Sequence, residues 1–416
     1  MAKILIVILF SWALIFYHSC TPFGDQRGVL SLSRAEDDII KDYTESFQTS
    51  AAFMTATKRC THCGKLVESN ISAGECMFRE LTSLPEDAPG RQKLFRETRK
   101  QLRGEATSGY GPASFLLGFI AENGLFGTKP DIITAARQYR LFAESGAPEG
   151  KAALAAFWIR LGENLPAAIE LLNRALEENP RNTDYYMYLS HAYTMLNKPL
   201  EAFETAKKAY YHSPVHSTER LGIEMIFVEK LMIAAPVIGK EAALAQINDM
   251  IYISPKNKKL IFDRANLYAL FGDFATAEKE LDSLKKDYPP VPLRIAKARL
   301  RAMQNNLSGA KQELSSLLAE DPENHIVRTA MLELLMERGR KAEAFETVNK
   351  FIESDKDKTG AYILRANLHL MNEDIQSAIA DFELAKKTAP PAAADDIDQA
   401  IQSLKKAAEE PEFPEM

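Results

Sequence analysis

The chain has 416 residues, of which 46% are hydrophobic and 26% are charged, a balance typical of a folded globular protein. Its formal charge of −6 at pH 7 argues against a protein that binds nucleic acid over its whole surface. The length would accommodate two or three ordinary domains, or one long array of repeats.

The first residues have the features of an export signal. Lys3 precedes an apolar run from Ile4 to Tyr17, which is too short to span a bilayer as a helix but suits the apolar core of a signal peptide. Ser19-Cys20 follows, and a small residue before cysteine resembles the bacterial lipoprotein signal. That resemblance implies removal of residues 1–19 and lipidation of Cys20. Tyr17 departs from the aliphatic residue usual there, so an ordinary cleaved signal or a short anchor remains the alternative.

The residues after Cys20 bear on location and on the start of the folded part. Thr21-Pro22 places no aspartate next to the cysteine, which in lipoproteins implies the outer membrane, with the protein facing the periplasm. Residues 20–32 contain one proline and two glycines and are predicted to be a tether. Residues 33–110 are predicted to form a helical region that carries a cysteine-containing loop.

Three chemical interpretations compete for that loop, Cys60 to Cys76. A redox dithiol at Cys60 and Cys63 would need a thioredoxin-like frame, which the surrounding sequence lacks. Zinc has four ligands by count if His62 is included, but His62 lies between the first two cysteines and is poorly placed to share their metal. A disulfide involving Cys60 and Cys63 is the simplest interpretation, because an exported protein can keep such a bond.

A basic helix is predicted next, after a break at residues 85–90. The segment from Arg91 to Arg103 holds six cations against one acid, Glu97. It is either a solvated helix face or a surface that contacts anionic lipid headgroups.

The first repeat-like unit covers residues 111–148. It has small residues in both predicted helices and a long glycine-containing turn between them, where glycine permits positive φ. These features resemble the Sel1-like repeat. The matching residues are Gly118, Gly124, Gly127, Asp131, Ala136, Tyr139, Ala143, Gly146 and Ala152.

The rest of the array, residues 149–392, is periodic. Ala168, Ala175 and Pro180 recur as Ala202, Ala209 and Pro214. Further closing prolines follow, mostly at the same spacing or its double: Pro255, Pro289, Pro322 and Pro390. A period of about 34 residues with small residues at fixed points resembles the tetratricopeptide repeat. The predicted fold is therefore all-α: a right-handed superhelical α-solenoid of tetratricopeptide/Sel1-like helix pairs.

Two departures from the period are predicted to have structural consequences. The step from Pro214 to Pro255 is longer than the others and contains Pro236, which predicts an extended helix or an irregular turn. Residues 393–408 repeat apolar positions at helical spacing and are predicted to be a C-terminal capping helix. The acidic, proline-containing tail, residues 409–416, is predicted to be disordered.

No phosphate-binding loop, nucleophile elbow or metalloprotease motif occurs in the chain, and its histidines are scattered. The sequence therefore predicts neither an enzyme nor a cofactor or metal site. In tetratricopeptide repeats, the fifth and ninth positions of the first helix are among those that line the ligand groove. Aligning the closing prolines, with one residue of slack for Arg299 in its shorter unit, gives the candidate peptide-binding residues Met187, His191, Phe262, Asn266, Arg299 and Asn367.

These patterns predict an envelope-anchored scaffold or assembly factor that binds other proteins through its concave surface. Partners would include the membrane, through a lipid at Cys20, but not nucleic acid. Related lipoproteins serve secretion, pilus and polysaccharide-export machines. The alternative is a redox or metal module at Cys60–Cys76, with the repeat array as a targeting arm.

Overall fold

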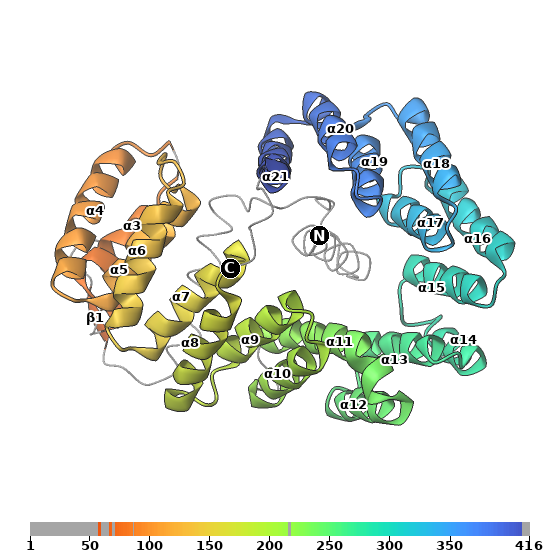
Figure 1. The fold of residues 1–416 in the computed structure, drawn as a ribbon, viewed down its shortest axis with the longest axis horizontal. Coiled ribbons are helices and arrows are strands. Elements are labelled where there is room, and N and C mark those ends of the chain that lie inside the picture. Colours follow the sequence, from red (N-terminus) through yellow and green to blue (C-terminus); the bar gives the residue numbers. More distant parts are fainter. Residues whose placement is uncertain (1–56, 60–65, 69–70, 86, 215–217, 410–416) are drawn as a thin grey trace. The chain divides into compact units, whose positions relative to one another are not determined.

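A computed structural model describes residues 57–59, 66–68, 71–85, 87–214 and 218–409, which comprise two short strands and a series of consecutive helices (Figure 1). The strands are β1 (Thr57–Arg59) and β2 (Leu66–Glu68), and the helices run from α3 to α21. The helices are α3 (Ala73–Thr82), α4 (Arg91–Thr107), α5 (Gly111–Asn123), α6 (Ile132–Glu144), α7 (Pro148–Leu161), α8 (Leu165–Glu178), α9 (Thr183–Met195), α10 (Pro199–His212), α11 (Thr218–Ile238), α12 (Lys240–Ile253), α13 (Lys258–Leu270), α14 (Phe274–Ser283), α15 (Pro290–Met303), α16 (Leu307–Glu320), α17 (His325–Glu337), α18 (Lys341–Ser354), α19 (Thr359–Met371), α20 (Ile375–Thr388) and α21 (Pro391–Glu409).

Neighbouring helices pack as pairs, and the pairs stack in two layers. Each odd-numbered helix from α5 to α19, α11 apart, contacts the even-numbered helix that follows it. Odd-numbered helices also contact each other, α3 to α5 to α7 to α9 and α13 to α15 to α17 to α19, more closely than even-numbered ones do. The odd-numbered helices therefore form an inner layer and the even-numbered helices an outer layer. This is the arrangement of an α-solenoid, and it confirms the predicted fold class.

A recurring alanine explains how the pairs approach so closely. The fourth residue of every even-numbered helix from α6 to α20 is alanine, and each is at most 2% exposed. A methyl group at a helix crossing lets the partner helix come near, while larger residues fill the space on either side. These alanines are Ala135, Ala168, Ala202, Ala243, Ala277, Ala310, Ala344 and Ala378.

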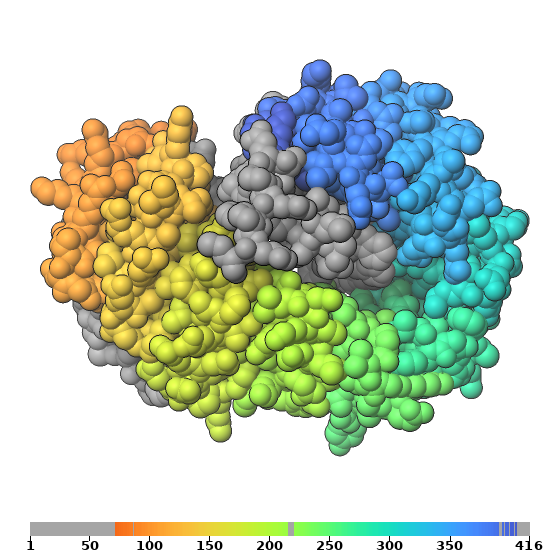
Figure 2. Space-filling view, in the orientation of Figure 1, coloured from red at the N-terminus to blue at the C-terminus, as the bar shows by residue number. Residues whose placement is uncertain are grey.

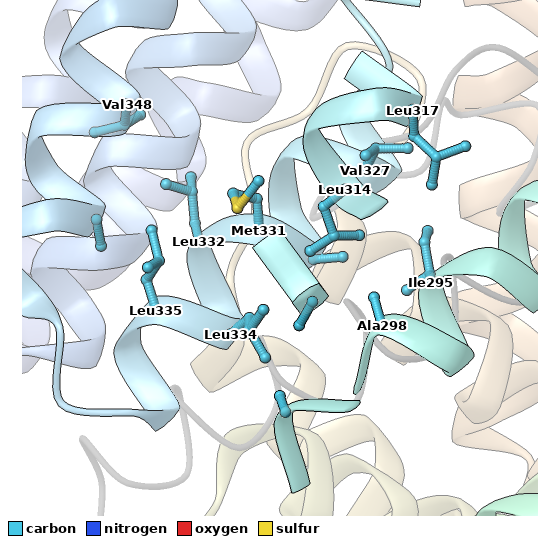
Figure 3. Packing of buried hydrophobic residues seen from close by; sticks show 14 of the residues in the cluster. Ile295, Ala298, Leu314, Leu317, Val327, Met331, Leu332, Leu334, Leu335 and Val348 are labelled. Carbon is cyan, nitrogen blue, oxygen red and sulfur yellow. The ribbon is translucent and has the colours of Figure 1, made fainter. Parts of the chain in front are cut away.

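Larger apolar residues complete the core between pairs. Around α17, Val327, Met331 and Leu335 meet Leu314 from α16 and Val348 from α18 in one buried cluster (Figure 3). All of the closing prolines but Pro289 lie two residues after an outer helix has ended, as at Pro180 and Pro322. Proline there cannot continue a helix, so each outer helix stops at a fixed point and the chain turns to the next pair.

The helices fall into two compact units, divided between Ala234 and Ala235 inside α11. This helix has 21 residues, far more than its neighbours, and contains Pro236 in its last turn. The extended helix predicted from the long step between Pro214 and Pro255 is thus confirmed. Within each unit, the side chains of successive helices form a continuous band of surface (Figure 2).

The 111–148 unit shows why its glycines are needed. Gly124 and Gly127 have φ of +63° and +77° in the long turn between α5 and α6. On α5, a Cβ at Gly118 would lie 3.1 Å from the Tyr139 ring, and at the start of α7, one at Gly150 would lie 2.3 Å from the Phe142 carbonyl oxygen. The predicted glycine positions of this unit are therefore confirmed as sites of tight turns and close packing.

The N-terminal region differs in part from the expectation of helices alone. β1 and β2 pair as an antiparallel ribbon, with Thr57 opposite Glu68. The helix break at residues 85–90 is present, between α3 and α4. At the other end, α21 packs Ile397, Ile401 and Leu404 onto α19 and α20, as predicted for a capping helix. The signal, the tether and all of the tail but Glu409 lie outside the described residues.

Candidate functional site

The two repeat positions predicted to line a groove have different roles in the structure. Residues at the fifth position are mostly core: Phe262 is only 4% exposed, and its ring stacks on Tyr288 at 5.2 Å. Ile363, at the same position of α19, is 5% exposed, and Met187 on α9 is half-buried. Phe262 is therefore a packing residue, and the interpretation of it as a ligand contact was wrong.

The ninth position, by contrast, is half-buried and polar in four consecutive inner helices. Its residues are Asn266 on α13, Arg299 on α15, Glu333 on α17 and Asn367 on α19. We call these four residues the polar ladder. All four belong to the same compact unit.

Two members of the polar ladder contact each other directly. The Arg299 guanidinium Nη2 donates a hydrogen bond to Glu333 Oε2 at 2.6 Å, from α15 to α17. The side chain of Glu333 is 12% exposed, and burial raises the pKa of its carboxyl, an effect that Arg299 opposes. Since these residues occupy equivalent positions, their contact shows that the ninth positions of adjacent inner helices are within side-chain reach.

The two asparagines end the polar ladder with unused hydrogen-bonding capacity. Within the described part of the chain, neither the Asn266 nor the Asn367 amide has a hydrogen-bond partner. A primary amide offers two N–H donors and a carbonyl acceptor, which matches the alternating groups of a peptide backbone. Among the described residues, the asparagine side chains therefore make no hydrogen bond to a neighbouring helix.

An arginine two residues earlier holds each asparagine's helix in place. Arg264 donates to Glu280 at 2.8 and 3.0 Å and to Asn248 at 2.8 Å, on the outer helices α14 and α12. Arg365 makes the equivalent contacts: it donates to Asp381 at 2.6 and 2.8 Å and to Asn349 at 2.7 Å. We call such an arginine, together with its acceptors on two outer helices, a bracket. Two residues on a helix are about 200° apart, so each asparagine points away from the outer layer.

The motif Arg-Ala-Asn-Leu occurs at residues 264–267 and again at 365–368, but the sequence analysis did not predict this bracket. The signal was present, because both arginines have an asparagine and a carboxylate at the same distance along the chain, 16 residues before and 16 residues after. That spacing corresponds to the step between paired helices. The bracket is a second structural repeat, superimposed on the alanines, and it fixes the direction in which the polar ladder faces.

His191 occupies the ninth position of α9, in the other unit. Burial lowers the pKa of its imidazole to about 4, and the positive charge of Lys230 on α11 adds to the effect. His191 is therefore neutral near pH 7. A neutral imidazole has one donor and one acceptor nitrogen, so it can take part in the same type of hydrogen bonding as an amide.

The cysteine-containing region is only partly described. Cys76, at the start of α3, is 4% exposed and disulfide-bonded. A cysteine in a disulfide has no thiolate for a metal, which argues against a zinc site that includes Cys76. Cys60 and Cys63 lie outside the described residues, so their pairing stays a prediction, as does the lipidation of Cys20.

Polar contacts hold the start of α3 near Cys76. Ser72 and Glu75 form a capping box, and Glu105 of α4 accepts hydrogen bonds from Ser72 Oγ and the Gly74 N–H. The Tyr110 hydroxyl donates to Glu75 at 2.5 Å, and burial together with this carboxylate raises the pKa of Tyr110. The disulfide-bonded segment is thus fixed to the first helix pair, as a structural bridge would require.

The described residues contain no group of three or more His, Cys, Asp and Glu side chains placed to hold a metal ion. None of the helices in the described ranges is both long and apolar enough to cross a bilayer. The polar ladder is the candidate site, and it presents two amides, one cation and one anion on adjacent inner helices.

The stacked pairs define the class: an α-helical repeat protein with the α-solenoid fold. In agreement, the sequence pattern of the tetratricopeptide repeat matches residues 160–215, which include α8, α9 and α10. This match coincides with the stretch from Pro166 to Pro214 in which the period of the repeat is clearest.

Solved structures of several repeat proteins are similar to this chain. One is a tetratricopeptide repeat protein from Parabacteroides merdae, 21% identical over 62% of this chain and 97% of that one, with a TM-score of 0.36. A tetratricopeptide protein from Thermus thermophilus is 25% identical over 46% and 100%, with a TM-score of 0.32. A Sel1 repeat protein from Oxalobacter formigenes is 13% identical over 93% and 99%, with a TM-score of 0.37. No curated protein matches the sequence.

Proposed function

We propose that the chain is a scaffold or assembly factor of the bacterial cell envelope that holds an extended segment of a partner protein along the polar ladder. The observation that carries this proposal is the pair of amides, Asn266 and Asn367, which lie at equivalent positions on inner helices and have no hydrogen-bond partner in the described ranges. Hydrogen-bonding groups without a partner among the described residues, at fixed intervals along one face, suit a ligand with repeating donors and acceptors.

The contacts around the asparagines support a rigid binding face. The brackets from Arg264 and Arg365 prevent α13 and α19 from rotating, so the amides are held in position before a ligand arrives. A pre-organised site loses little conformational entropy when it binds. Between the asparagines, the bond from Arg299 to Glu333 keeps the centre of the polar ladder close to neutral, which favours a polypeptide backbone over a strongly charged ligand.

The binding test compares the double variant Asn266→Ala/Asn367→Ala with Asn173→Ala. Asn173 is an exposed asparagine on the outer helix α8 and serves as the matched control. Each lost amide contact is expected to cost about 0.5–1.5 kcal/mol, so the double variant should bind a partner roughly 5- to 150-fold more weakly. Partners would be captured from an envelope extract on the wild-type chain and their affinity then measured for all three proteins.

The outcome that would contradict the binding proposal is specific. If the wild-type chain and the double asparagine variant bind every captured partner with equal affinity, the polar ladder is not part of the binding surface. A drop in thermal stability of the double variant alone would assign the asparagines to packing instead. Weakened binding with unchanged melting is the expected result.

The envelope location is tested separately, through Cys20. The apolar run ending in Ser19-Cys20 motivates the proposal of a lipid anchor, and acyl chains would supply the attachment. Cys20→Ser should move the protein from the membrane fraction to the soluble fraction. A wash at about 1 M salt screens charges more than about 3 Å apart and so removes electrostatic attachment. If the variant still sediments with membranes after this wash, the lipid anchor is refuted.

A further inference from the structure

Helix α4 lies in the outer layer of its unit and has one apolar and one basic face. Phe95, Thr98 and Leu102 are at most 5% exposed and pack toward α3 and α5. Arg91 is also buried, with its guanidinium 5.1 Å from the centre of the Phe126 ring. Of the six cations seen in the sequence, Arg91 is therefore part of the core rather than of the surface.

The remaining cations form a line on the opposite face. Lys93, Arg96, Lys100 and Arg103 follow each other at intervals of three, four and three residues, and all four are exposed. This spacing keeps side chains on one side of a helix, here over about 15 Å. Arg99 lies half-buried beside them; burial and the nearby charge of Arg103 lower its pKa. We call Lys93, Arg96, Arg99, Lys100 and Arg103 the basic stripe.

The basic stripe lacks the carboxylates that neutralise cations elsewhere in the chain. Lys93 has an exposed partner in Glu97 at 4.0 Å, but the other four cations have no acidic partner among the described residues. Glu105, on the same helix, accepts hydrogen bonds from Ser72 and Gly74 rather than from these cations. A cluster of like charges without counter-charges raises the local positive potential and leaves it available to an anionic partner.

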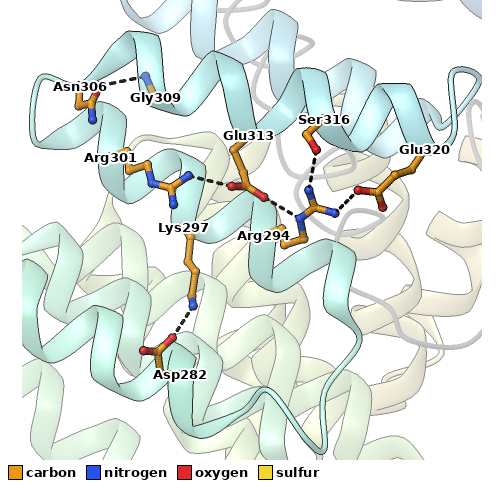
Figure 4. A network of polar contacts seen from close by, with 9 residues as sticks. All are labelled: Asp282, Arg294, Lys297, Arg301, Asn306, Gly309, Glu313, Ser316 and Glu320. Carbon is orange, nitrogen blue, oxygen red and sulfur yellow. Dashed lines mark hydrogen bonds and ion pairs between the residues drawn. The ribbon is translucent and has the colours of Figure 1, made fainter.

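A basic helix in the other unit shows the contrast. On α15, Arg294 contacts Glu313, Glu320 and Ser316, at 2.6, 2.7 and 3.2 Å (Figure 4). Arg301 on the same helix also donates to Glu313, at 2.9 Å. Arg294 and Arg301 thus have carboxylate acceptors, whereas Arg96, Arg99, Lys100 and Arg103 have none among the described residues.

We infer that the basic stripe of α4 binds the surface of an anionic lipid bilayer. Four exposed, flexible cations in a line can contact many phosphate groups without a fixed geometry, which is how juxtamembrane basic segments bind lipid headgroups. A specific protein site would need an apolar anchor, and a single-stranded nucleic acid would need aromatic side chains for stacking. Among the described residues of α4, none is an exposed large hydrophobic or aromatic residue.

This inference goes beyond the proposed scaffold function and does not depend on it. It concerns residues of α4 rather than the proposed lipid at Cys20 or the polar ladder. The basic stripe lies on an outer helix of one unit, whereas the polar ladder lies on inner helices of the other. The two proposed activities therefore use different residues on different units.

The experiment measures binding of the full chain to vesicles of phosphatidylcholine, alone or mixed with phosphatidylglycerol. Any insertion of the apolar N-terminal run would be common to both vesicles, so the difference between them isolates the electrostatic part. The variant Arg96→Gln/Lys100→Gln/Arg103→Gln should bind the anionic vesicles roughly 150-fold more weakly, since each cation near such a surface contributes about 1 kcal/mol. Salt at about 1 M should abolish the difference between the vesicles.

The matched control removes three other cations. Lys256, Lys279 and Lys286 are exposed, lie on or near α12–α14 and have no ion pair within the described ranges. The variant Lys256→Gln/Lys279→Gln/Lys286→Gln has the same net charge as the α4 variant and should retain wild-type vesicle binding. Circular dichroism verifies that both variants are folded.

Three results would overturn the inference. One is equal binding of the wild-type chain to both vesicles, and another is equal loss in the α4 variant and the control. The third is tighter binding of the wild-type chain to single-stranded RNA than to anionic vesicles at the same salt concentration, which would assign the basic stripe to nucleic acid. Failure of the Asn266 and Asn367 test would leave this result unaffected, so the two proposals fail independently.

Discussion

Arg299 and Glu333 stand 34 residues apart in the sequence and 2.6 Å apart in the fold, joined by a hydrogen bond from guanidinium to carboxylate. The period of the repeat thus brings equivalent positions of successive inner helices into contact. The same geometry places Asn266 and Asn367 on the helices that flank the pair.

Removal of Arg299 should be more harmful than removal of both members of the pair. In Arg299→Met the buried Glu333 carboxylate loses its partner, and the free energy of unfolding should fall by about 1–3 kcal/mol. Adding Glu333→Gln removes the unpaired charge and should recover at least half of that loss. Urea denaturation of the wild-type chain and of the single and double variants measures these differences.

A double variant as unstable as Arg299→Met would contradict this prediction, because it would mean that the arginine contributes through packing alone. The exposed pair Arg174 and Glu170 on α8 provides the control. Surface ion pairs of this kind contribute less than about 1 kcal/mol, so Arg174→Met should be close to neutral.

The bracket at Arg365 should be among the strongest polar contributions in its unit. Asp381 is 4% exposed and receives two hydrogen bonds from Arg365, so Arg365→Ala would leave a buried carboxylate without its main partner. We expect a loss of about 2–4 kcal/mol in unfolding free energy. Lys350→Ala, which removes an exposed pair with Glu346, should leave the unfolding free energy close to that of the wild-type chain.

Hydrogen exchange would show whether the effect of Arg365→Ala is local. Faster exchange should appear first in α18, α19 and α20, the three helices that the bracket joins. Faster exchange limited to α19 would mean that the arginine stabilises only its own helix, in conflict with the bracket.

Much of the fold was accessible from sequence because its determinants are local and periodic. In each repeat, an alanine such as Ala202 marks the helix crossing and a proline such as Pro214 marks the end of the outer helix. Both depend on properties of single residues: a small side chain and a missing N–H. The extended α11 followed from the long step between closing prolines and from Pro236. The β1–β2 ribbon was missed because three-residue strands carry too little periodicity to be recognised.

The candidate site was only half accessible, for a different physical reason. Family positions identify which residues can face the inner side, but burial decides which of them do. Phe262 and Asn266 are one helical turn apart, yet Phe262 lies against Tyr288 while Asn266 stays half-buried. That difference depends on Tyr288, which lies in the connection between α14 and α15. A single sequence does not reveal which distant side chain packs against Phe262.

Close approach of α6 and α7 makes Gly150 sensitive to any side chain. A Cβ there would lie 2.3 Å from the Phe142 carbonyl oxygen, a backbone atom that cannot move without shifting α6. Gly150→Ala should therefore lower the unfolding free energy by about 1–3 kcal/mol. Gly104 on α4 has open space around its Cβ position, so Gly104→Ala should be neutral or stabilise by up to about 1 kcal/mol. Thermal melts of both variants test this contrast, and similar melting shifts would contradict it.

Acidification should weaken the unit that contains His191. The pKa of this imidazole is lowered to about 4 by burial and by Lys230, from 6.5 in an unfolded chain. Below about pH 6.5 the His191 imidazole is protonated in the unfolded state but stays neutral in the folded state. Stability is therefore lost as pH falls toward 4. Between about pH 7 and pH 4.5 this single group should lower the unfolding free energy by about 2–3 kcal/mol.

Comparison of two histidine variants isolates that contribution from the carboxylates, which also titrate in this range. His191→Gln keeps a polar side chain but removes the titration, so its stability should fall less than that of the wild-type chain between the two pH values. His325→Gln changes an exposed histidine at the start of α17 and should retain the wild-type dependence. Hydrogen exchange on α9 at both pH values provides the local measurement. If His191→Gln follows the wild-type curve, protonation of this imidazole is not what destabilises the inner helix in acid.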